Sequence, residues 1–535
     1  MDEAVGSPAV GAEVPRNESE HHLRRAVGPW GSFTWGYADV GADVYVALGI
    51  VVAAAQGGTN VAFLFAGLVY ICVGLAYTEL AAAYPFAGGG QFYVLRGLGD
   101  LLGFVAGWAV LLDFTIDISL FSLASAGYIS YFFPFLKGST TLQIAGISFP
   151  HIQPSLILLT TILIVALTGL NVVGVRESSA FNEIFGALDI VSETTILIFG
   201  FVFAFNGPLL IQQMTTAWPD TYHLAYGASL AIISFVGLES ISQASQETVR
   251  PSTVVPRTSI ALILTVLIYA LAFSNLGLAM LPWQSIAAHN EDPVAWLASH
   301  VPIVGIVAGP YVAGLGATLL LISANSGVFG ASRITYSMAR YRTLPAWFGK
   351  IHPRFRTPVR TLVTFSGIAL IELWAAGLSP NAYDTLGNMY AFGAASAYML
   401  VFVSLLLLRV RDPWTPRPFR VPLNLRIGAK NGQPIYLPIV GVLGFLGISS
   451  IVFMVILTHT IGRIAGPAWI LSGLALYWIY RKRVGLPLLG SVRHDWEKEQ
   501  MAVYRDAGEA EMEEEFEENL ERRNRLLVAQ KGARA

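Results

Sequence analysis

The sequence predicts an all-α integral membrane protein with about twelve membrane-spanning helices. Of its 535 residues, 54% are hydrophobic and 13% are charged, whereas about a quarter of the residues in an average soluble protein are charged. Apolar runs, most of them long enough to cross a bilayer as a helix, follow one another from Ser32 to Tyr480. The formal net charge of −2 gives no indication of a nucleic-acid partner, so we expect membrane lipid and a small molecule as partners.

The first apolar run, Ser32 to Ala55, carries two acidic residues and a glycine in its first half. An Asp at the bilayer centre costs roughly 2.5 to 3.5 kcal/mol, and irregular backbone at that depth is tolerated only where protein or a water-filled cavity satisfies it. We therefore expect a helix that is broken around Gly41 and lines half of a substrate site. The alternative is that both acids cap or snorkel at the cytoplasmic interface. The expected site residues of this run are Asp39, Gly41, Ala42, Asp43 and Tyr45.

Acidic residues recur in further apolar runs, and four of these runs bear on the site. They are Glu79 in run 61–84, Asp113 and Asp117 in run 101–133, Asp189 and Glu193 in run 182–205, and Glu239 in run 224–245. The acids four residues apart share one helical face. Gly237 interrupts its run as Gly41 interrupts the first, and two corresponding broken segments are typical of a transporter site between inverted repeats. Two ordinary membrane glycines are the alternative.

The remaining apolar runs are 155–173, 259–281, 301–338, 362–378, 383–408, 438–457 and 469–480. The glycine-rich connector at 88–100 lacks the Lys-Ser/Thr pair of a phosphate-binding loop, so we reject a nucleotide site. The chain has one cysteine, Cys72, inside an apolar run, and its nine histidines are scattered among loops and termini. We therefore expect no disulfide, no metal and no cofactor.

Basic residues fall on alternate connections between the runs, while the opposite side shows only Lys137 and Arg463. The positive-inside rule places the basic connections in the cytoplasm, so we expect a multi-pass plasma-membrane protein with both termini cytoplasmic. The first 30 residues are polar and lack the apolar core of a signal peptide, which leaves targeting to the first span. An acidic block between Glu509 and Glu518 lies in the polar tail; we interpret this tail as a solvated helix, with docking on the basic loops as the alternative.

Four segments resemble the amino acid/polyamine/organocation (APC) permeases. They are AYTELAAAYPFAGGGQFYVLR (76–96), SFVGLESISQASQETVRPSTVVPRTS (234–259), GASRITYSMARYRTLPAWFGKIHPRFRTPV (330–359) and LLLLRVRDPWTPRPFRVP (405–422). The resemblance implies a LeuT-type fold, in which helices one to five are repeated upside down as helices six to ten and two further helices are peripheral. The corresponding divisions are a cytoplasmic tail at 1–31, the first repeat at 32–206, the second repeat at 223–410, the last two helices at 436–482 and a cytoplasmic tail at 483–535.

The sequence departs from this family at two positions. Asp43 stands where the family has the second glycine of a motif that binds a substrate carboxylate, and a carboxylate there repels another one. Asp43 therefore points away, is protonated or faces a cationic ligand. Asp189 stands where proton-coupled members often carry a lysine; it could carry a proton, help to hold a cation, or only pack between helices.

Three short segments, LLDFTID (111–117), GLESIS (237–242) and DTLGNMYAFG (384–393), are more similar to the potassium-importing branch of the superfamily. That similarity implies oxygen ligands for a cation from Asp39, Tyr45, Asp113 and Tyr390.

The resemblance implies a secondary active transporter, not an enzyme, that moves amino acids or related organic amines by alternating access with coupling to protons or a cation such as sodium. A potassium-uptake transporter on the same fold is the first alternative, and a membrane sensor or enzyme without transport is the second. The substrate-binding residues that we expect are Asp39, Gly41, Ala42, Asp43, Tyr45, Asp113, Asp117, Phe235, Gly237, Glu239 and Tyr390. The residues expected to act in coupling or gating are Glu79, Asp189, Asn325 and Ser326.

Overall fold

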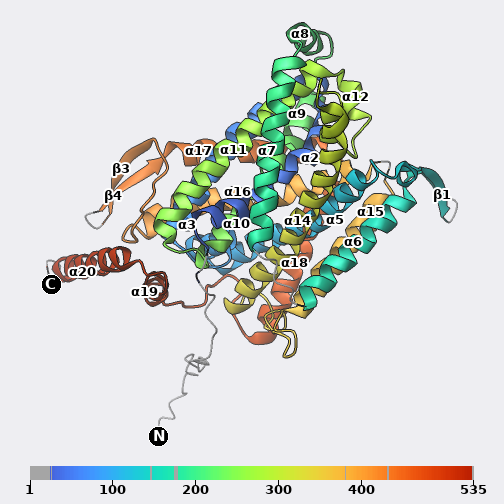
Figure 1. Cartoon of the computed structure of the whole chain (residues 1–535). Coiled ribbons are helices and arrows are strands. Elements are labelled where there is room, and N and C mark those ends of the chain that lie inside the picture. The colour runs from blue at the N-terminus through green and yellow to red at the C-terminus, as the bar shows by residue number, and fades with distance from the viewer. Residues whose placement is uncertain are drawn as a thin grey trace.

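The computed structural model describes residues 25, 27–144, 147–173, 179–379, 381–430 and 433–532. Helices packed side by side make up almost all of the fold (Figure 1). Ten segments of these residues are long and apolar enough to cross a membrane, and the first of them, Pro29–Ala83, contains the first two apolar runs of the sequence. The all-α membrane class is confirmed, while the number of twelve spans stays a prediction.

The first half of the chain is helical except for one hairpin. Its elements are α1 (Pro29–Val40), η1 (Gly41–Asp43), α2 (Val44–Ala55), η2 (Gln56–Gly58), α3 (Thr59–Ala83), α4 (Gly89–Leu98), α5 (Asp100–Ile129), η3 (Pro134–Lys137), β1 (Thr140–Ile144), β2 (Ile147–Ile152), α6 (Pro154–Val173), α7 (Ser179–Phe203), α8 (Gly207–Thr216), α9 (Thr221–Leu230), η4 (Ala231–Phe235), α10 (Glu239–Gln243) and η5 (Ala244–Gln246).

The second half has the same character, again with one antiparallel hairpin. Its elements are α11 (Pro251–Met280), α12 (Trp283–Ala287), α13 (Pro293–Ser299), α14 (Gly305–Arg340), α15 (Val359–Gly377), α16 (Ala382–Arg411), β3 (Asn424–Lys430), β4 (Gln433–Pro438), α17 (Ile439–Thr458), α18 (Gly462–Val484), α19 (Trp496–Asp506) and α20 (Ala510–Gly532). The hairpins β1–β2 and β3–β4 extend from opposite sides of the helical body (Figure 1).

The first apolar run is less interrupted than the sequence predicts. Between α1 and α2 the backbone stays right-handed, with φ −65° and ψ −38° at Gly41, and tightens into the 3₁₀ turn η1. A 3₁₀ turn keeps backbone groups hydrogen-bonded, which low-dielectric surroundings require. A methyl group on Gly41 would lie 2.8 Å from ring atoms of Tyr37, so the glycine permits close packing of that ring rather than an unwound segment.

The sixth run is truly broken. After η4 the chain becomes extended at Val236 (ψ 147°), and Gly237 adopts φ +119° before α10 begins. A side chain is strained at this φ, so the position favours glycine. The two runs that the sequence treats alike therefore differ: one is tightened and the other is unwound.

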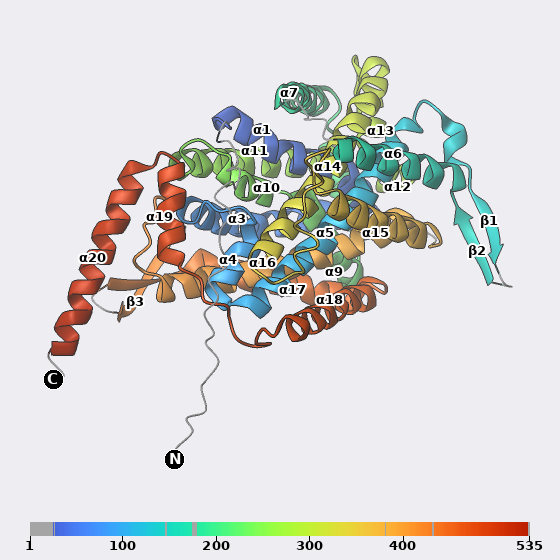
Figure 2. The same cartoon turned by 90° about the horizontal axis from the view of Figure 1, so that it is seen from below.

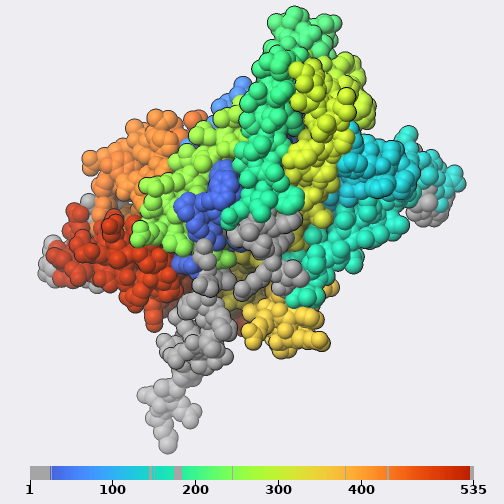
Figure 3. Space-filling view, viewed as in Figure 1, coloured from blue at the N-terminus to red at the C-terminus, as the bar shows by residue number. Residues whose placement is uncertain are grey.

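Several connections contain structure that the sequence analysis did not foresee. The glycine-rich connector forms helix α4, the connection between α7 and α9 contains α8, and the connection between α11 and α14 contains α12 and α13. Helix α5 lies at the centre, where it packs most extensively against α14 and α16. The tail forms α19 and α20 beside the helical body (Figures 2 and 3).

Candidate functional site

Five carboxyl groups from three parts of the chain meet inside the helical body. Asp39 and Asp43 come from α1 and η1, Asp113 and Asp117 from α5, and Glu239 from the start of α10. Each residue is at most 5% exposed, and their charges act on one another. The structure thus brings together all five acids expected in a substrate site; we name this group the central acid cluster.

Asp39 is held by hydroxyl groups from two other helices. Ser240 of α10 donates to its Oδ2 and Ser326 of α14 donates to its Oδ1. Ser323 of α14 also donates to the main-chain carbonyl of Asp39 at 3.2 Å. Asp39 therefore links α1 to α10 and α14 through neutral donors.

The break in the sixth run lies directly against α1. A methyl group on Gly237 would be 3.1 Å from the main-chain nitrogen of Val40 and 3.2 Å from Cγ of Asp39. Any side chain at Gly237 would therefore push α10 away from the carboxylate. The glycine is needed both for its backbone angle and for this close approach.

Glu239 closes the central acid cluster on the side of α16. Its Oε2 accepts hydrogen bonds from the main-chain N–H of Gly237 at 3.1 Å and from the hydroxyl of Tyr398 at 2.7 Å. Its carboxyl group also acts electrostatically on that of Asp113. A carboxylate only accepts hydrogen bonds, so the two acids could bond to each other only with a proton between them.

The remaining two acids are less well satisfied. The hydroxyl of Tyr390 lies 3.4 Å from Oδ1 of Asp117. Both carboxyl oxygens of Asp43 are buried, and neither has a hydrogen-bond partner among the described residues. A buried charge without a partner is unfavourable by several kcal/mol, so Asp43 is either neutral or positioned for a cation.

No ion pair joins the central acid cluster to a basic side chain within the described residues. In the same part of the chain, no group of three or more acidic, histidine or cysteine side chains is arranged to hold a metal ion. The cluster therefore gathers many hydrogen-bond acceptors, and the donors that contact them among the described residues are hydroxyl groups and one main-chain N–H. It is suited to an organic ammonium group, which can donate to several carboxyls at once.

Comparison with known proteins decides the family. Residues 30–480 match the family model described as amino acid permease. The chain belongs to this family.

This permease is 24% identical over 483 residues to the branched-chain amino acid permease BcaP of Bacillus subtilis, an alignment that covers 88% of this chain and 96% of the relative. It is 26% identical over 398 residues to the gamma-aminobutyric acid permease of the same species, covering 72% of this chain and 80% of the relative. It is 25% identical over 410 residues to the vacuolar cationic amino acid transporter 4 of Arabidopsis thaliana, an alignment that covers 74% of this chain and 65% of the relative. The protein is therefore a membrane transporter and not an enzyme.

A second pair of carboxyl groups lies beside the central acid cluster. Asp189 and Glu193 of α7 are at most 1% exposed, and they accept hydrogen bonds from Tyr45 at 2.7 Å and Tyr37 at 2.8 Å, respectively. The two tyrosines lie on either side of the 3₁₀ turn in the permease's first helix. Tyr45, expected to contact substrate, is thus bound to Asp189, expected to act in coupling.

The other expected residues lie around these two groups. Ala42 is buried in η1, and Phe235 stacks on Tyr70 with ring centroids 5.0 Å apart. The side-chain oxygen of Asn325 accepts a hydrogen bond from Asn171 at 2.6 Å. Asn325 therefore bonds to α6, while its neighbour Ser326 bonds to Asp39.

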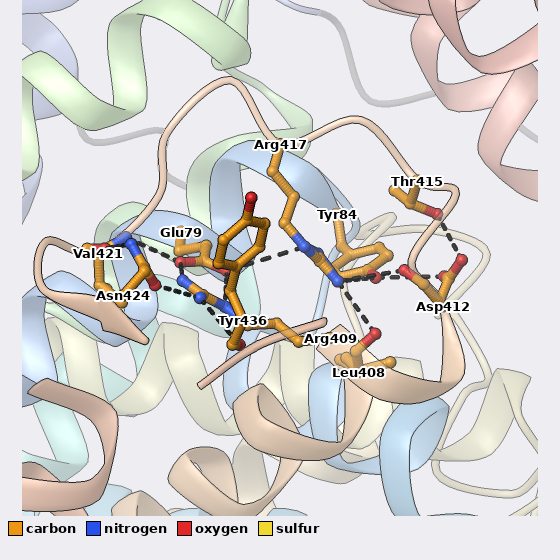
Figure 4. A network of polar contacts seen from close by, with 10 residues as sticks. All are labelled: Glu79, Tyr84, Leu408, Arg409, Asp412, Thr415, Arg417, Val421, Asn424 and Tyr436. Carbon is orange, nitrogen blue, oxygen red and sulfur yellow. Dashed lines mark hydrogen bonds and ion pairs between the residues drawn. The ribbon is translucent and has the colours of Figure 1, made fainter. Parts of the chain in front are cut away.

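Glu79 is remote from the central acid cluster and belongs to a network at one end of the bundle. Arg409 at the end of α16 donates hydrogen bonds to both carboxyl oxygens of Glu79. Nε of Arg417 lies 3.8 Å from Oε1, and the main-chain N–H of Val421 donates to Oε2 at 2.8 Å. Figure 4 shows the carboxylate between the two guanidinium groups. Glu79 thus ties α3 to α16 and to the loop that follows it, while its role in gating stays a prediction.

Asp412 continues this network. Arg96 donates to it at 2.7 Å and the hydroxyl of Tyr84 at 3.2 Å. Burial acts to raise the pKa of Asp412, but Arg96 and Arg417 outweigh it and hold that pKa below its ordinary value. Basic partners surround this acid, whereas no ion pair among the described residues reaches the central acid cluster.

Side chains of these sites that sequence reasoning missed include Ser240, Ser323, Tyr37 and Tyr398, and Glu193 was noted as an acid without a role in the site. Ser240 follows Glu239 by one residue, and Tyr37 precedes Asp39 by two, so proximity to expected residues was the available signal. Tyr398 carries no such signal, because only the packing of α16 against α5 and η4 brings it to Glu239.

Proposed function

We propose that this permease binds the ammonium group of an amino acid or organic amine at the central acid cluster and carries it across the membrane by alternating access. The observation that carries the proposal is the burial of five carboxyl groups without a basic partner among the described residues. The main-chain N–H of Gly237 is already bonded to Glu239, so the site favours a cationic group over a carboxylate. Substrates with more positive than negative charge fit it best.

The names of two relatives agree with amines as substrates, since one is a cationic amino acid transporter and another a gamma-aminobutyric acid permease. Uptake of radiolabelled lysine, putrescine, leucine and potassium into the same batch of proteoliposomes tests the proposal. We expect uptake of lysine or putrescine to exceed that of leucine. Potassium uptake without amine uptake would replace the proposal by the cation alternative, for which Asp39, Tyr45, Asp113 and Tyr390 are the expected oxygen ligands. The absence of any flux would favour the sensor.

Movement is proposed to follow the family's architecture. Helices one, two, six and seven (α1–α2, α3, α9–α10 and α11) would rock against the rest. The tightened turn η1 and the unwound segment at Val236 to Leu238 lie in this moving group, and both contact the central acid cluster. Ser326 and Asp113, on the other group, would lose or exchange their contacts as the site opens.

Coupling is proposed to use a proton on the Asp189–Glu193 pair. The two carboxyl groups act on each other electrostatically, and two carboxylates at a separation of about 4 Å would repel each other by about 4 kcal/mol at an effective dielectric of about 20. One oxygen of each acid has no hydrogen-bond partner among the described residues, which leaves room for a shared proton. Tyr37 and Tyr45 would transmit its presence to η1.

The variant Asp189→Asn tests this coupling. We expect it to lose accumulation driven by a pH gradient while retaining exchange of labelled for unlabelled substrate, because exchange needs no net proton movement. Loss of both activities would assign Asp189 to substrate binding or packing, and retention of both would exclude it from coupling. A sodium gradient tested in parallel distinguishes a sodium-coupled mechanism.

We propose that the protein lies in the plasma membrane with both termini in the cytoplasm. Arg25, near the start of the chain, donates to the carbonyl of Val503 in α19 at 3.5 Å, so the two ends of the described chain lie on the same side. The arginine-rich network around Glu79 and Arg96 is on that side as well, as the positive-inside rule expects for a cytoplasmic face. Labelling of cysteines introduced at each end in intact cells tests the orientation.

A further inference from the structure

We infer that the C-terminal helices α19 and α20 form a strap that opposes opening of the permease toward the cytoplasm, an inference that rests on the alternating-access function proposed above. The sequence favoured a solvated tail, but three sets of contacts fix this segment to the transport domain. They reach helices of both groups that would move relative to each other.

The first contacts are with the end of α3, in the moving group. The side-chain N–H of Gln500 and the hydroxyl of Tyr504 both donate to the main-chain carbonyl of Ala83, each at 3.1 Å. Both side chains are at most 1% exposed. The carbonyls at a helix C-terminus have no partner within the helix, so the tail supplies donors that α3 lacks.

The second contacts are with α4 and with the end of α14, outside the moving group. Arg96 donates to Oε1 of Gln500 at 2.7 Å, and Trp496 packs edge-on against Phe92 with ring centroids 5.6 Å apart. The hydroxyl of Tyr341 lies 3.2 Å from Oε2 of Glu499. Helix α19 therefore holds both groups of helices at one end of the molecule.

The third contact is with the start of α11, again in the moving group. One carboxyl oxygen of Glu509 accepts hydrogen bonds from the main-chain N–H of Ser252 at 3.0 Å and from its hydroxyl at 2.6 Å. The residue before this helix, Arg250, has no side-chain capping bond of its own. Glu509 thus caps α11 from the tail, and a carboxylate is favoured at a helix N-terminus.

Helix α20 stabilises the turn that presents Glu509. Met512 and Phe516 form a small apolar core with Tyr504, and Arg523 of α20 pairs with Glu497 of α19 at 2.7 Å. Much of the rest of α20 is exposed, and Figure 2 shows it extending away from the body. The contacts with the transport domain are therefore made by α19 and Glu509, and α20 stabilises the position of both.

A reversible cross-link tests the strap directly. In a Cys72→Ala background, Ser252→Cys and Glu509→Cys are joined by a bifunctional methanethiosulfonate reagent, and substrate uptake into proteoliposomes is measured before linking, after linking and after reduction. We expect linking to lower uptake at least tenfold and reduction to restore it. The matched control joins Glu497→Cys to Arg523→Cys, which links α19 to α20 without touching the transport domain, and should leave uptake unchanged.

Uptake by the linked Ser252–Glu509 protein at the unlinked rate would overturn the strap but leave the transport function standing. A lack of uptake before linking, with the full-length protein also inactive, would instead refute the proposed function.

Weakening the strap gives the opposite expectation. Tyr504→Phe removes one hydrogen bond to Ala83 and Glu509→Gln removes the charge at Ser252, so each should raise the initial uptake rate by about two- to tenfold. Glu514→Gln, on the exposed face of α20, is the control. If a strap variant has the melting temperature of the wild type but transports at the same or a lower rate, the tail only supports the fold.

Discussion

Two of the regions where this permease buries carboxyl groups differ completely in the partners of those groups. In the network around Glu79, two arginines and a main-chain N–H surround one carboxylate. In the central acid cluster, five carboxyls share serine and tyrosine hydroxyls and one main-chain N–H. The first arrangement completes its own charge balance and is suited to holding helices together. No basic side chain of the described residues pairs with the second, and we propose that the substrate supplies the positive charge.

The largest expected effect concerns the completed network. Glu79→Gln leaves Arg409 and Arg417 buried without their common counter-charge, which should lower the free energy of unfolding by about 3 to 5 kcal/mol. A marked fall in the melting temperature of the purified protein would show this. The double variant Glu79→Gln with Arg409→Gln should recover part of the loss, since both members of the pair are then neutral. An unchanged melting temperature in the single variant would mean that the pair does not hold the fold.

The central acid cluster should respond in the opposite way. Asp39→Asn removes a charge that no basic side chain of the described residues balances, so stability should be retained, but a hydrogen bond to a charged group is worth about 1.5 to 3 kcal/mol. We therefore expect the apparent substrate affinity to fall by about 10- to 100-fold. The measurements are concentration-dependent uptake and substrate-induced thermal stabilisation. Wild-type affinity in this variant, with Glu514→Gln as control, would remove Asp39 from the binding site.

A third kind of buried titratable group lies outside the membrane spans. His459, between α17 and α18, is fully buried beside Ser229 at 2.8 Å, and burial lowers its pKa to about 3. The folded protein keeps this histidine neutral, whereas the unfolded chain binds a proton below a pH of about 6.5. The contribution of the neutral His459 to the free energy of unfolding is therefore fully present above a pH of about 6.5. It is lost as the pH falls toward 3, by about 1.4 kcal/mol per pH unit.

Melting at pH 7 and pH 5 tests this expectation, with a difference of about 2 kcal/mol from His459 alone. His459→Gln, which lacks the titrating group, should be less sensitive to acid over that interval. Equal acid sensitivity of the two proteins would contradict a neutral, buried histidine.

The smallest expected effect sharpens the role of a residue that only packing revealed. Tyr398→Phe removes one of the hydrogen-bond donors to Glu239. The carboxyl group of Glu239 still accepts a hydrogen bond from the N–H of Gly237 and still lies near the carboxyl group of Asp113. A net loss of about 0.5 to 1.5 kcal/mol corresponds to roughly a two- to tenfold weaker apparent affinity. Uptake kinetics measure this change, and an unaltered affinity would show that Tyr398 satisfies Glu239 without influencing the substrate.

The two interrupted helices show why local sequence alone was an incomplete guide to backbone shape. Gly41 and Gly237 both indicated a break, but only Gly237 adopts a left-handed φ. Gly41 packs closely against the Tyr37 ring, and the backbone there continues as a 3₁₀ turn. Whether a glycine unwinds a helix depends on what packs against it, which is a tertiary property.

The sequence by itself determined the membrane class, the family and the identity of the buried acids, because hydrophobicity, spacing and motifs are local quantities that need no partner. Tertiary structure alone decided that α10 places Ser240 on Asp39, that α16 brings Tyr398 to Glu239, and that Tyr37 and Tyr45 bond to α7. It also decided that the tail docks. Each of these contacts joins residues more than a hundred positions apart, and helix packing, rather than the residue types involved, sets which of them meet.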